Sequence, residues 1–297
     1  MKFNAVFEGG GLRAIAFVGA LSCLEKQGYI WGNAAGTSAG SLIASLVCSG
    51  YTSKELKDLL ININFLKFID SDTLIKKNMV TKAISFFKDK GIYSGDYLEE
   101  WLDKLLKEKG ITTFGDLKSK NRCILKIIAS DITKKRMLIL PDDLPEYGID
   151  SDSFSIAKAV RMSCSIPFYF KPVELNYKDG TSFIVDGSLC CNYPITIFDN
   201  MNTSISTLGF KFKVSNVSYT ALGKTDPLSL LFDMADTIRK QNVEENWINE
   251  ENLKRSILIP IEDVDSKEFD ISKEKSLSLY RSGYRSAQEF LERQSLS

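Results

Sequence analysis

Two glycine-rich turns, each between a strand pattern and a helix pattern, constrain the fold of this chain more than any other feature. Residues 3–7 predict a short strand that runs into Glu8-Gly9-Gly10-Gly11, and residues 12–27 carry apolar residues at helical spacing. Residues 29–35 predict a second strand, and a helix from Ser38 to about Cys48 follows. This β-α-β-α order predicts a mostly parallel sheet covered by helices, which is a three-layer α/β/α sandwich.

The rest of the sequence extends that sheet. Between 52 and 117 the patterns predict amphipathic helices, including one at 95–109, and no strong strand. Further strands are expected at 125–129, 137–140, 173–177, 181–185, 203–212 and 256–260, and further helices at 156–164, 227–247 and 272–293. No linker-like segment divides the chain, so we expect a single domain over residues 1–297, with a core at about 3–212 and a C-terminal helical tail at about 225–297.

The second turn matches the G-x-S-x-G pattern of a serine nucleophile placed on a sharp strand-to-helix turn. It reads Gly36-Thr37-Ser38-Ala39-Gly40, and the small residues on either side of Ser38 are what such a turn requires. The alternative is an ordinary glycine-rich turn. The chain contains no histidine, so no imidazole can take the proton from Ser38. A nucleophilic Ser38 would therefore need a carboxylate, a lysine or a terminal amine as its base.

The first turn has two functional interpretations. Gly9, Gly10 and Gly11 lie between a strand and a helix, where backbone N–H groups converge on an anion. A dinucleotide site would need an acidic residue about 20 positions further on, and the sequence reads Ala34-Ala35-Gly36 there. The other interpretation is an oxyanion hole for an attacked carbonyl, with Arg13 adding a positive charge one turn later. Arg13 is otherwise an ordinary exposed helix residue.

A third feature is the pair Asp186-Gly187 at the end of the strand predicted at 181–185. Gly187 allows a sharp turn, and an aspartate at this position reaches the edge of the sheet where α/β folds hold their sites. Taken alone, the pair is typical of an ordinary Asp-Gly turn.

Together these blocks resemble the patatin-like phospholipase family. The family carries a G-G-G-x-R/K block, a G-x-S-x-G elbow and a later D-G-G/A, and this chain has the same order in 9–13, 36–40 and 186–188. The segments 159–170 and 192–194 also look like family blocks, and the resemblance runs from about Phe3 to Phe212. Ser188 departs from the family pattern, but it is small and we expect it to have little effect.

The resemblance implies a patatin-like fold and a lipid acyl hydrolase that cleaves fatty-acyl esters of phospholipids or lysophospholipids. Such an enzyme uses a Ser-Asp dyad without histidine, metal or cofactor. Carried over to the matching positions, the implied residues are Ser38 as nucleophile and Asp186 as base, Gly9, Gly10 and Gly11 as oxyanion donors, Arg13 as a loop or phosphate contact, and Gly36, Gly40 and Gly187 as supports of the motifs.

Other interpretations remain open at this point. One is a serine peptidase or amidase with a Ser-Lys dyad, and another is a non-catalytic module that binds an anion on the glycine loop. The apolar residues at 61–87 fit either a helical layer packed on the core or a lid that contacts a membrane over the acyl groove.

Composition narrows the partners and the compartment. The 38 acidic and 38 basic residues balance, so no global charge favours nucleic acid. The six cysteines form no disulfide or zinc pattern, and we expect free thiols in a reducing compartment. The N-terminal segment lacks a signal-peptide pattern, and no apolar run approaches the roughly 20 residues of a transmembrane helix. We therefore expect a cytoplasmic protein whose membrane contact is at most peripheral.

Overall fold

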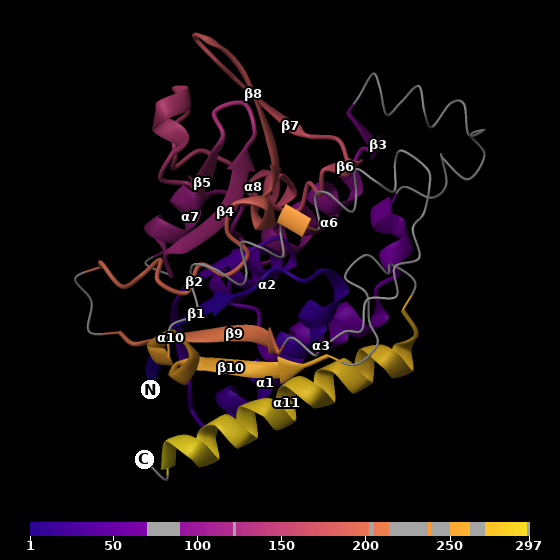
Figure 1. Ribbon diagram of the computed structural model, residues 1–297, viewed down its shortest axis with the longest axis vertical. Coiled ribbons are helices and arrows are strands. Elements are labelled where there is room, and N and C mark those ends of the chain that lie inside the picture. Colours follow the sequence, from indigo (N-terminus) through magenta and orange to yellow (C-terminus); the bar gives the residue numbers. More distant parts are fainter. Residues whose placement is uncertain are drawn as a thin grey trace.

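A large mixed sheet forms the centre of the molecule (Figure 1). The computed structural model describes residues 1–69, 90–120, 123–201, 205–213, 237–238, 250–261 and 271–295. Within these residues the sheet has the strand order β10-β9-β1-β2-β4-β8-β7, and β5 also pairs with β4. Its strands are β1 (Lys2–Phe7), β2 (Ile30–Thr37), β4 (Leu125–Asp131), β5 (Arg136–Leu140), β7 (Val173–Tyr177), β8 (Gly180–Asp186), β9 (Thr207–Lys213) and β10 (Ser256–Pro260).

The part of the sheet that carries the two glycine-rich turns is parallel, as the sequence predicts. Strand β1 pairs in parallel with both β2 and β9, and β10-β9 and β2-β4 are also parallel. Strand β5 pairs antiparallel with the edge of β4 that faces away from β2, β8 pairs antiparallel with the other edge beyond the end of β2, and β7 pairs antiparallel with β8. The chain leaves β1 toward β2 on one side and returns as β9 on the other. This change of direction is where open α/β sheets place their sites.

Helices flank the sheet in the layered arrangement that the sequence predicts. The chief ones are α1 (Ile15–Lys26), α2 (Ala39–Cys48), α3 (Ser53–Asn62), α6 (Asp96–Glu108), α7 (Phe114–Ser119), α8 (Ile156–Ser163), α10 (Glu250–Lys254) and α11 (Lys273–Ser295). Alternate residues of β1 face opposite sides of the sheet. Ala5 and Phe7 belong to the main apolar core with α1 and α2, whereas Val6 packs against a smaller cluster around Tyr193 and Ile195.

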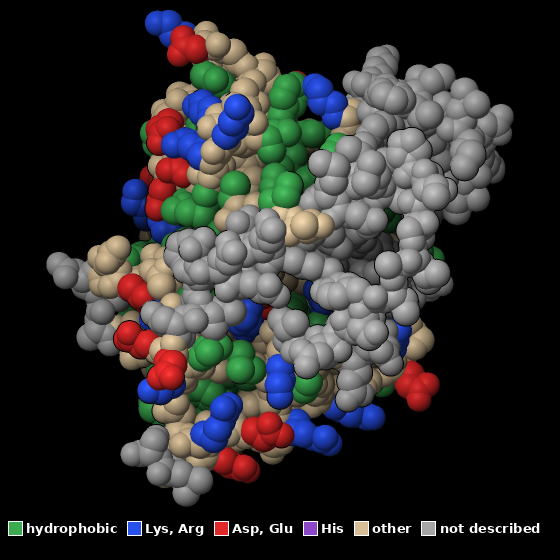
Figure 2. Space-filling view, in the orientation of Figure 1, with side chains coloured by type: hydrophobic (Ala, Val, Ile, Leu, Met, Phe, Trp, Pro, Cys, Tyr) green, Lys and Arg blue, Asp and Glu red, His purple; other side chains and the backbone are tan. Residues whose placement is uncertain are grey.

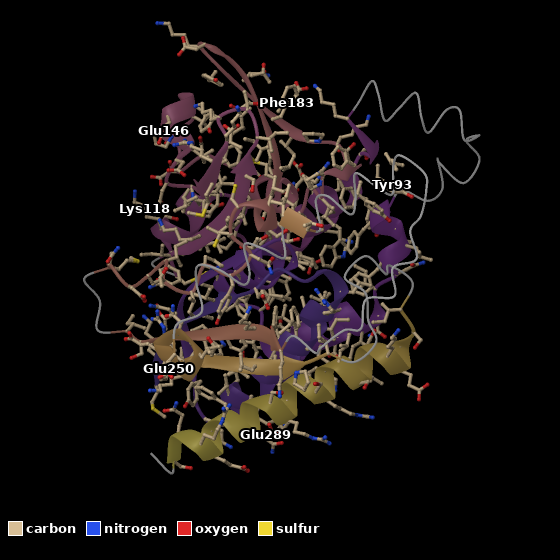
Figure 3. All side chains as sticks on the ribbon, in the orientation of Figure 1. Tyr93, Lys118, Glu146, Phe183, Glu250 and Glu289 are labelled. Atoms are coloured by element: carbon tan, nitrogen blue, oxygen red, sulfur yellow. A yellow bond between two sulfur atoms is a disulfide. The ribbon has the colours of Figure 1, made fainter. Side chains whose placement is uncertain are left out.

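Two glycines bring α1 and α11 into close contact beneath the sheet (Figure 1). A Cβ at Gly19 would overlap the carbonyl oxygen of Tyr280, and a Cβ at Gly283 would overlap that of Ala16. The two helices therefore touch backbone to backbone. Glu289 lies on the exposed side of α11 (Figure 3).

The predicted elements agree with the structure except where strands are very short. The segment 52–117 contains β3 (Gly91–Tyr93), which pairs with β6 (Phe168–Phe170) in a separate two-stranded sheet. The sequence predicts neither strand, because three residues carry no readable alternation. All of the segment 70–87, and all but residues 237–238 of the helix predicted at 227–247, lie outside the described residues.

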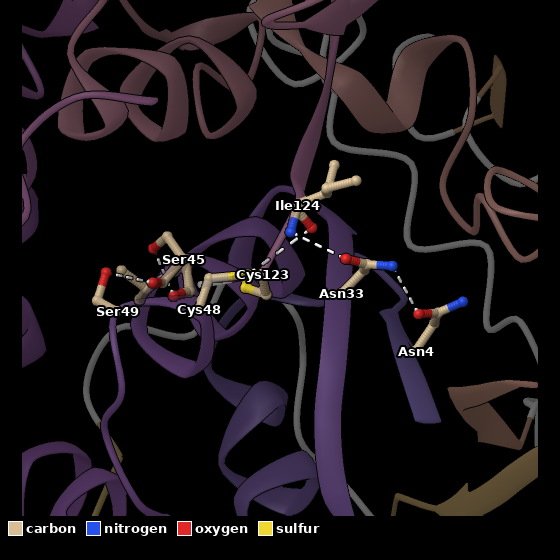
Figure 4. The surroundings of a disulfide bond; sticks show 8 residues. Asn4, Asn33, Ser45, Cys48, Ser49, Cys123 and Ile124 are labelled. Carbon is tan, nitrogen blue, oxygen red and sulfur yellow. Dashed lines mark hydrogen bonds between the residues drawn. A yellow bond between two sulfur atoms is a disulfide. The ribbon is translucent and has the colours of Figure 1, made fainter. Parts of the chain in front are cut away.

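The expectation of six free thiols is wrong for one pair. Cys48 and Cys123 form a disulfide, with their Cα atoms 5.3 Å apart, while Cys23, Cys164, Cys190 and Cys191 are free (Figure 4). Cys48 ends α2 and Cys123 precedes β4, and the pairing of β2 with β4 brings these ends together. Sequence spacing could not reveal this contact, because 75 positions separate the two residues. The thiol argument for a reducing compartment therefore no longer applies to this pair.

The surface carries mixed charge on the face seen in Figure 2. Basic and acidic side chains are interspersed over the lower part of that face, around α11. No helix in the described part of the chain combines the length and apolarity needed to cross a bilayer.

Candidate active site

Ser38 occupies a strained turn between β2 and α2. Its φ is 52° and its ψ is −128°, a conformation that a non-glycine residue adopts only at a cost of about 1–3 kcal/mol. The turn depends on glycine on both sides. A Cβ at Gly36 would clash with the backbone of Gly40, and a Cβ at Gly40 would lie 2.5 Å from the carbonyl oxygen of Phe7. The close packing of strand and helix leaves Ser38 at the apex of the turn.

Asp186 meets Ser38 along one edge of β4, where β8 pairs with β4 directly beyond the end of β2. Thr37 of β2 is in register with Ile128, and the next residue of β4, Ala129, is in register with Asp186 of β8. The Ser38 hydroxyl donates a hydrogen bond of 2.7 Å to Oδ2 of Asp186. Both residues are buried, with 8% and 2% of their surfaces exposed. The structure thus brings together the two residues that the sequence singles out.

The second carboxylate oxygen of Asp186 is held by Ser188. The backbone N–H of Ser188 donates to Oδ1 over 2.8 Å, and its hydroxyl donates to the same atom. A Cβ at Gly187 would overlap the carbonyl oxygen of Ile128, so the turn between these residues is tight. The expectation that Ser188 has little effect overlooked this contact, because the sequence does not show which way the hydroxyl points.

Ser163, at the end of α8, holds the backbone of Ser38. Its hydroxyl accepts a hydrogen bond of 2.8 Å from the N–H of Ser38 and donates one of 2.6 Å to the carbonyl of Ile128. The N–H of Ser38 is therefore occupied and not available to a substrate. Ser163 lies in the block that resembles the family, but nothing in the sequence links it to Ser38.

The glycine loop presents two N–H groups on one side. Gly10 has φ −177° and ψ 19°, which nearly eclipses its own nitrogen with that of Gly11 and turns both N–H bonds the same way. Among the described residues, neither N–H has a hydrogen-bond acceptor. Arg13 donates from Nε to the carbonyl of Gly10 over 3.0 Å, and its guanidinium lies 5.1 Å from the centre of the Phe212 ring. Arg13 thus contacts the loop itself.

Three buried polar residues to which no role was assigned from the sequence lie beneath the loop, although Asn192 belongs to the block 192–194 that resembles the family. They are Glu8, Lys211 and Asn192. The Lys211 ammonium lies 2.8 Å from the Glu8 carboxylate, and both side chains are 5% exposed. One signal was readable, since Lys211 interrupts the apolar strand around Phe210 and Phe212, and a charge in such a strand indicates a buried partner.

An apolar pocket opens beside Ser38. Gly11, Ser38 and Ala39 line one end, and apolar side chains from α1, α2, α3, α6 and the segment after α8 line the rest. Its side-chain walls are Leu12, Ala14, Ile15, Leu42, Ile43, Leu60, Phe65, Phe68, Leu98, Cys164, Ile166 and Phe170. Leu60, Phe65 and Phe68 belong to or adjoin the segment 61–87, so its described part packs on the core around the pocket.

Cys164 is the other nucleophilic side chain on this pocket. Burial, together with the nearby charge of Asp186, raises the pKa of the Cys164 thiol well above its ordinary value. The thiol therefore remains protonated, in the form that does not attack a carbonyl. Among the described residues, no three acidic, cysteine or histidine side chains gather into a metal-binding group.

A family comparison agrees with this geometry. The model of the patatin-like phospholipase family matches residues 5–199, which include both glycine-rich turns and Asp186. The chain belongs to the patatin-like phospholipase family. Its glycine loop, elbow and Asp186 therefore lie in the part of the chain that defines the family.

Three relatives of known sequence match this chain, and one of them matches it over nearly its whole length. The uncharacterized protein YqhO of Bacillus subtilis is 35% identical over 98% of both chains. The probable lipid hydrolase 463L of Invertebrate iridescent virus 6 is 28% identical over 65% of this chain and 61% of its own. Triacylglycerol lipase 5 of Saccharomyces cerevisiae is 27% identical over 59% of this chain and 23% of its own. At the level of the family, these relatives support lipid acyl hydrolysis.

Solved structures share the patatin-like fold. VipD of Legionella pneumophila has a TM-score of 0.58 at 18% identity, and the match covers 98% of this chain and 67% of that one. The type III effector protein ExoU has a TM-score of 0.56 at 15% identity, covering 99% of this chain and 53% of that one. The likeness therefore includes the elements after residue 199, such as β9, β10 and α11.

Proposed function

We propose that this protein is a serine-dependent lipid acyl hydrolase that cleaves fatty-acyl esters of phospholipids or lysophospholipids. The observation that carries the proposal is the hydrogen bond of 2.7 Å from the Ser38 hydroxyl to Asp186, at the mouth of an apolar pocket. The match to the patatin-like phospholipase family supports the substrate class.

The dyad performs two proton transfers. Asp186 accepts the proton of the Ser38 hydroxyl as its oxygen attacks the ester carbonyl carbon, and it returns that proton to the departing alkoxide. The acyl group is then bonded to Ser38. In the second half, Asp186 takes a proton from water as the water oxygen attacks the acyl carbon, and Ser38 recovers the proton as it leaves. In sum, one ester and one water are consumed, and one fatty acid and one alcohol are released.

The oxyanion that forms in each half needs donors that are already in place. The N–H groups of Gly10 and Gly11 face one side and lack acceptors among the described residues. Both N–H groups can donate hydrogen bonds to the oxyanion. Gly9 has a different role, because its missing Cβ leaves room for the Asn192 side chain. The N–H of Ala39, the first residue of α2, is a further donor at a positive helix end.

The apolar pocket suits the acyl chain. Its lining side chains offer dispersion contacts and exclude water, and each methylene that they bury contributes about 0.8 kcal/mol. The sequence also allows a lid over this pocket that contacts a membrane, and the part of the segment 61–87 beyond residue 69 lies outside the described residues.

The test is a lipid-class release assay with matched variants. Ser38→Ala should abolish release of fatty acid, since it removes only the attacking oxygen. Asp186→Asn should lower kcat by about 10²-fold or more, because the amide cannot accept the proton. Ser153→Ala and Asp142→Asn change an exposed serine and an exposed carboxylate in the same way, and both should retain full activity.

Two results would point to another function. Full turnover in Asp186→Asn would indicate a lysine base and favour the peptidase or amidase interpretation. Failure of an active-site-directed fluorophosphonate to label wild-type Ser38 would favour an anion-binding module, since a binding module has no activated serine.

A further inference from the structure

Glu8 is an unusual residue to find beneath a catalytic loop, because its carboxylate is fully enclosed. Its Oε1 accepts hydrogen bonds from the Lys211 ammonium over 2.8 Å and from Nδ2 of Asn192 over 3.3 Å. Its Oε2 accepts a bond of 2.7 Å from the N–H of Phe212. The ammonium also faces the Tyr193 ring, 5.2 Å from its centre. Both charges are thus compensated, and one donor of Asn192 is directed at the pair.

Asn192 binds both backbone polar groups of Gly9, its N–H and its carbonyl. The N–H of Gly9 donates to the carbonyl of Asn192 over 3.0 Å, and Nδ2 of Asn192 donates to the carbonyl of Gly9 over 3.3 Å. The Asn192 side chain reaches this position only because residue 9 has no Cβ, which would overlap Oδ1 of Asn192. The contact is therefore built into the turn.

The carboxylate of Glu8 decides which way the Asn192 amide faces. Both neighbours of Nδ2, the Glu8 carboxylate and the Gly9 carbonyl, only accept hydrogen bonds. Rotating the amide by half a turn would set Oδ1 against two acceptors. In the observed orientation Oδ1 is buried and has no donor among the described residues. A buried acceptor without a donor lowers the stability of the fold, so stability alone does not account for this arrangement.

A hydrogen bond to the carbonyl of a peptide group also fixes the direction of the N–H in the same peptide group, because the group is planar. In a trans peptide the C=O and N–H bonds point in opposite directions. The carbonyl of Gly9 and the N–H of Gly10 belong to one peptide, so Asn192 sets the direction of that N–H. Arg13 acts in the same way on the next peptide, by binding the carbonyl of Gly10.

We propose that Asn192, oriented by the buried Glu8–Lys211 pair, is a positioning residue that aims the N–H of Gly10 at the oxyanion. This inference rests on the proposed hydrolase function. Asn192 touches no substrate atom, and its effect acts through the Gly9–Gly10 peptide. The expected loss therefore falls on the transition state rather than on substrate binding.

The experiment compares Asn192→Leu and Asn192→Ala with wild type on a soluble chromogenic ester. A misaimed donor should lower kcat by about 10- to 100-fold, less than the 10²–10³ typical of a donor removed outright, with KM within about threefold of wild type. The rate at which a fluorophosphonate labels Ser38 should fall in parallel, because that reaction also builds charge on an oxygen. Leucine has a similar size and alanine leaves a small cavity, so at least one variant should fold, and kinetics are measured below each melting temperature.

Tyr193→Phe is the matched control. It alters the neighbouring buried residue, removes a hydrogen bond of 2.6 Å to Ser256 and keeps the ring beside Lys211. It should lower the melting temperature and leave kcat unchanged. If the wild type is active and both Asn192 variants have the same kcat as the wild type, this inference is overturned but the proposed function is not. An inactive wild type that no fluorophosphonate labels would overturn the proposed function and this inference with it.

Discussion

At the scale of the residue, the site is built from side chains that hold a strained backbone rather than from extra catalytic groups. Ser38 has a positive φ, and Ser163 binds its N–H while Asp186 binds its hydroxyl. Ser41 adds a hydrogen bond of 2.6 Å to the carbonyl of Ser38. The N–H, hydroxyl and carbonyl of Ser38 are therefore all hydrogen-bonded, and its position is fixed from three directions.

Ser163→Ala should separate this support from the chemistry. The change leaves two buried groups without partners, the N–H of Ser38 and the carbonyl of Ile128, and should cost about 1–3 kcal/mol of unfolding free energy. It should also lower kcat by about 10-fold, because a small shift of the nucleophile lowers the rate steeply. Chemical denaturation and ester kinetics measure the two effects.

Ser153→Ala serves again as the control, since Ser153 is exposed. If Ser163→Ala matched the control in both stability and kcat, the hydrogen bond to the N–H of Ser38 would have no role in placing the nucleophile.

The site residues that the sequence could predict lie in contiguous motifs, and those that it could not predict reach the site from distant parts of the chain. Ser38 and the glycines lie in contiguous motifs whose backbone shape requires small residues, so local sequence is sufficient. Ser163 and Asn192 contact the site through hydrogen bonds to backbone atoms over 100 positions away. Such contacts depend on strand register and on side-chain direction, neither of which a pattern of residue types contains.

At the scale of the element, the C-terminal helix α11 packs closely on α1 because each helix has a glycine at the contact. Gly19 of α1 and Gly283 of α11 let the two backbones touch, and Leu279, Ala287 and Phe290 bury the same side of α11. The sequence predicts this helix from its spacing, but not its glycine contact, because an isolated glycine in a helix pattern has several explanations.

Gly283→Ala should therefore destabilise the protein, against the usual trend. Alanine in a helix interior normally adds about 0.5–1 kcal/mol relative to glycine. Here its Cβ would overlap the carbonyl oxygen of Ala16 in α1, so we expect a loss of about 1–3 kcal/mol. Gln288→Ala on the exposed side of α11 should change stability little. A melting temperature for Gly283→Ala at or above that of wild type would show that the helices move apart freely.

At the scale of the whole molecule, the segment that defines the family does not form the site by itself. The family model ends at residue 199, yet Lys211 and Phe212 come from β9, beyond that limit. Lys211 neutralises Glu8, and the Phe212 ring underlies Gly10 and Arg13. The parallel pairing of β9 with β1 places them there. The sequence predicts both strands, but the adjacency of β9 and β1 follows only from the assembled sheet.

The lining of the pocket also bears on how a turnover ends. In the proposed reaction the acyl ester group is neutral and the released fatty acid is an anion, and the described side chains that line the pocket carry no charge. An unpaired carboxylate is strongly disfavoured in apolar surroundings, and here it would also lie close to Asp186. If the proposed hydrolysis takes place here, it would turn a neutral acyl group that suits the pocket into an anion that does not, and this charge would favour release of the product. Added fatty acid should accordingly inhibit weakly at pH 8 and more strongly as the pH falls and the acid becomes neutral, whereas equal inhibition at both would indicate a cation in the pocket.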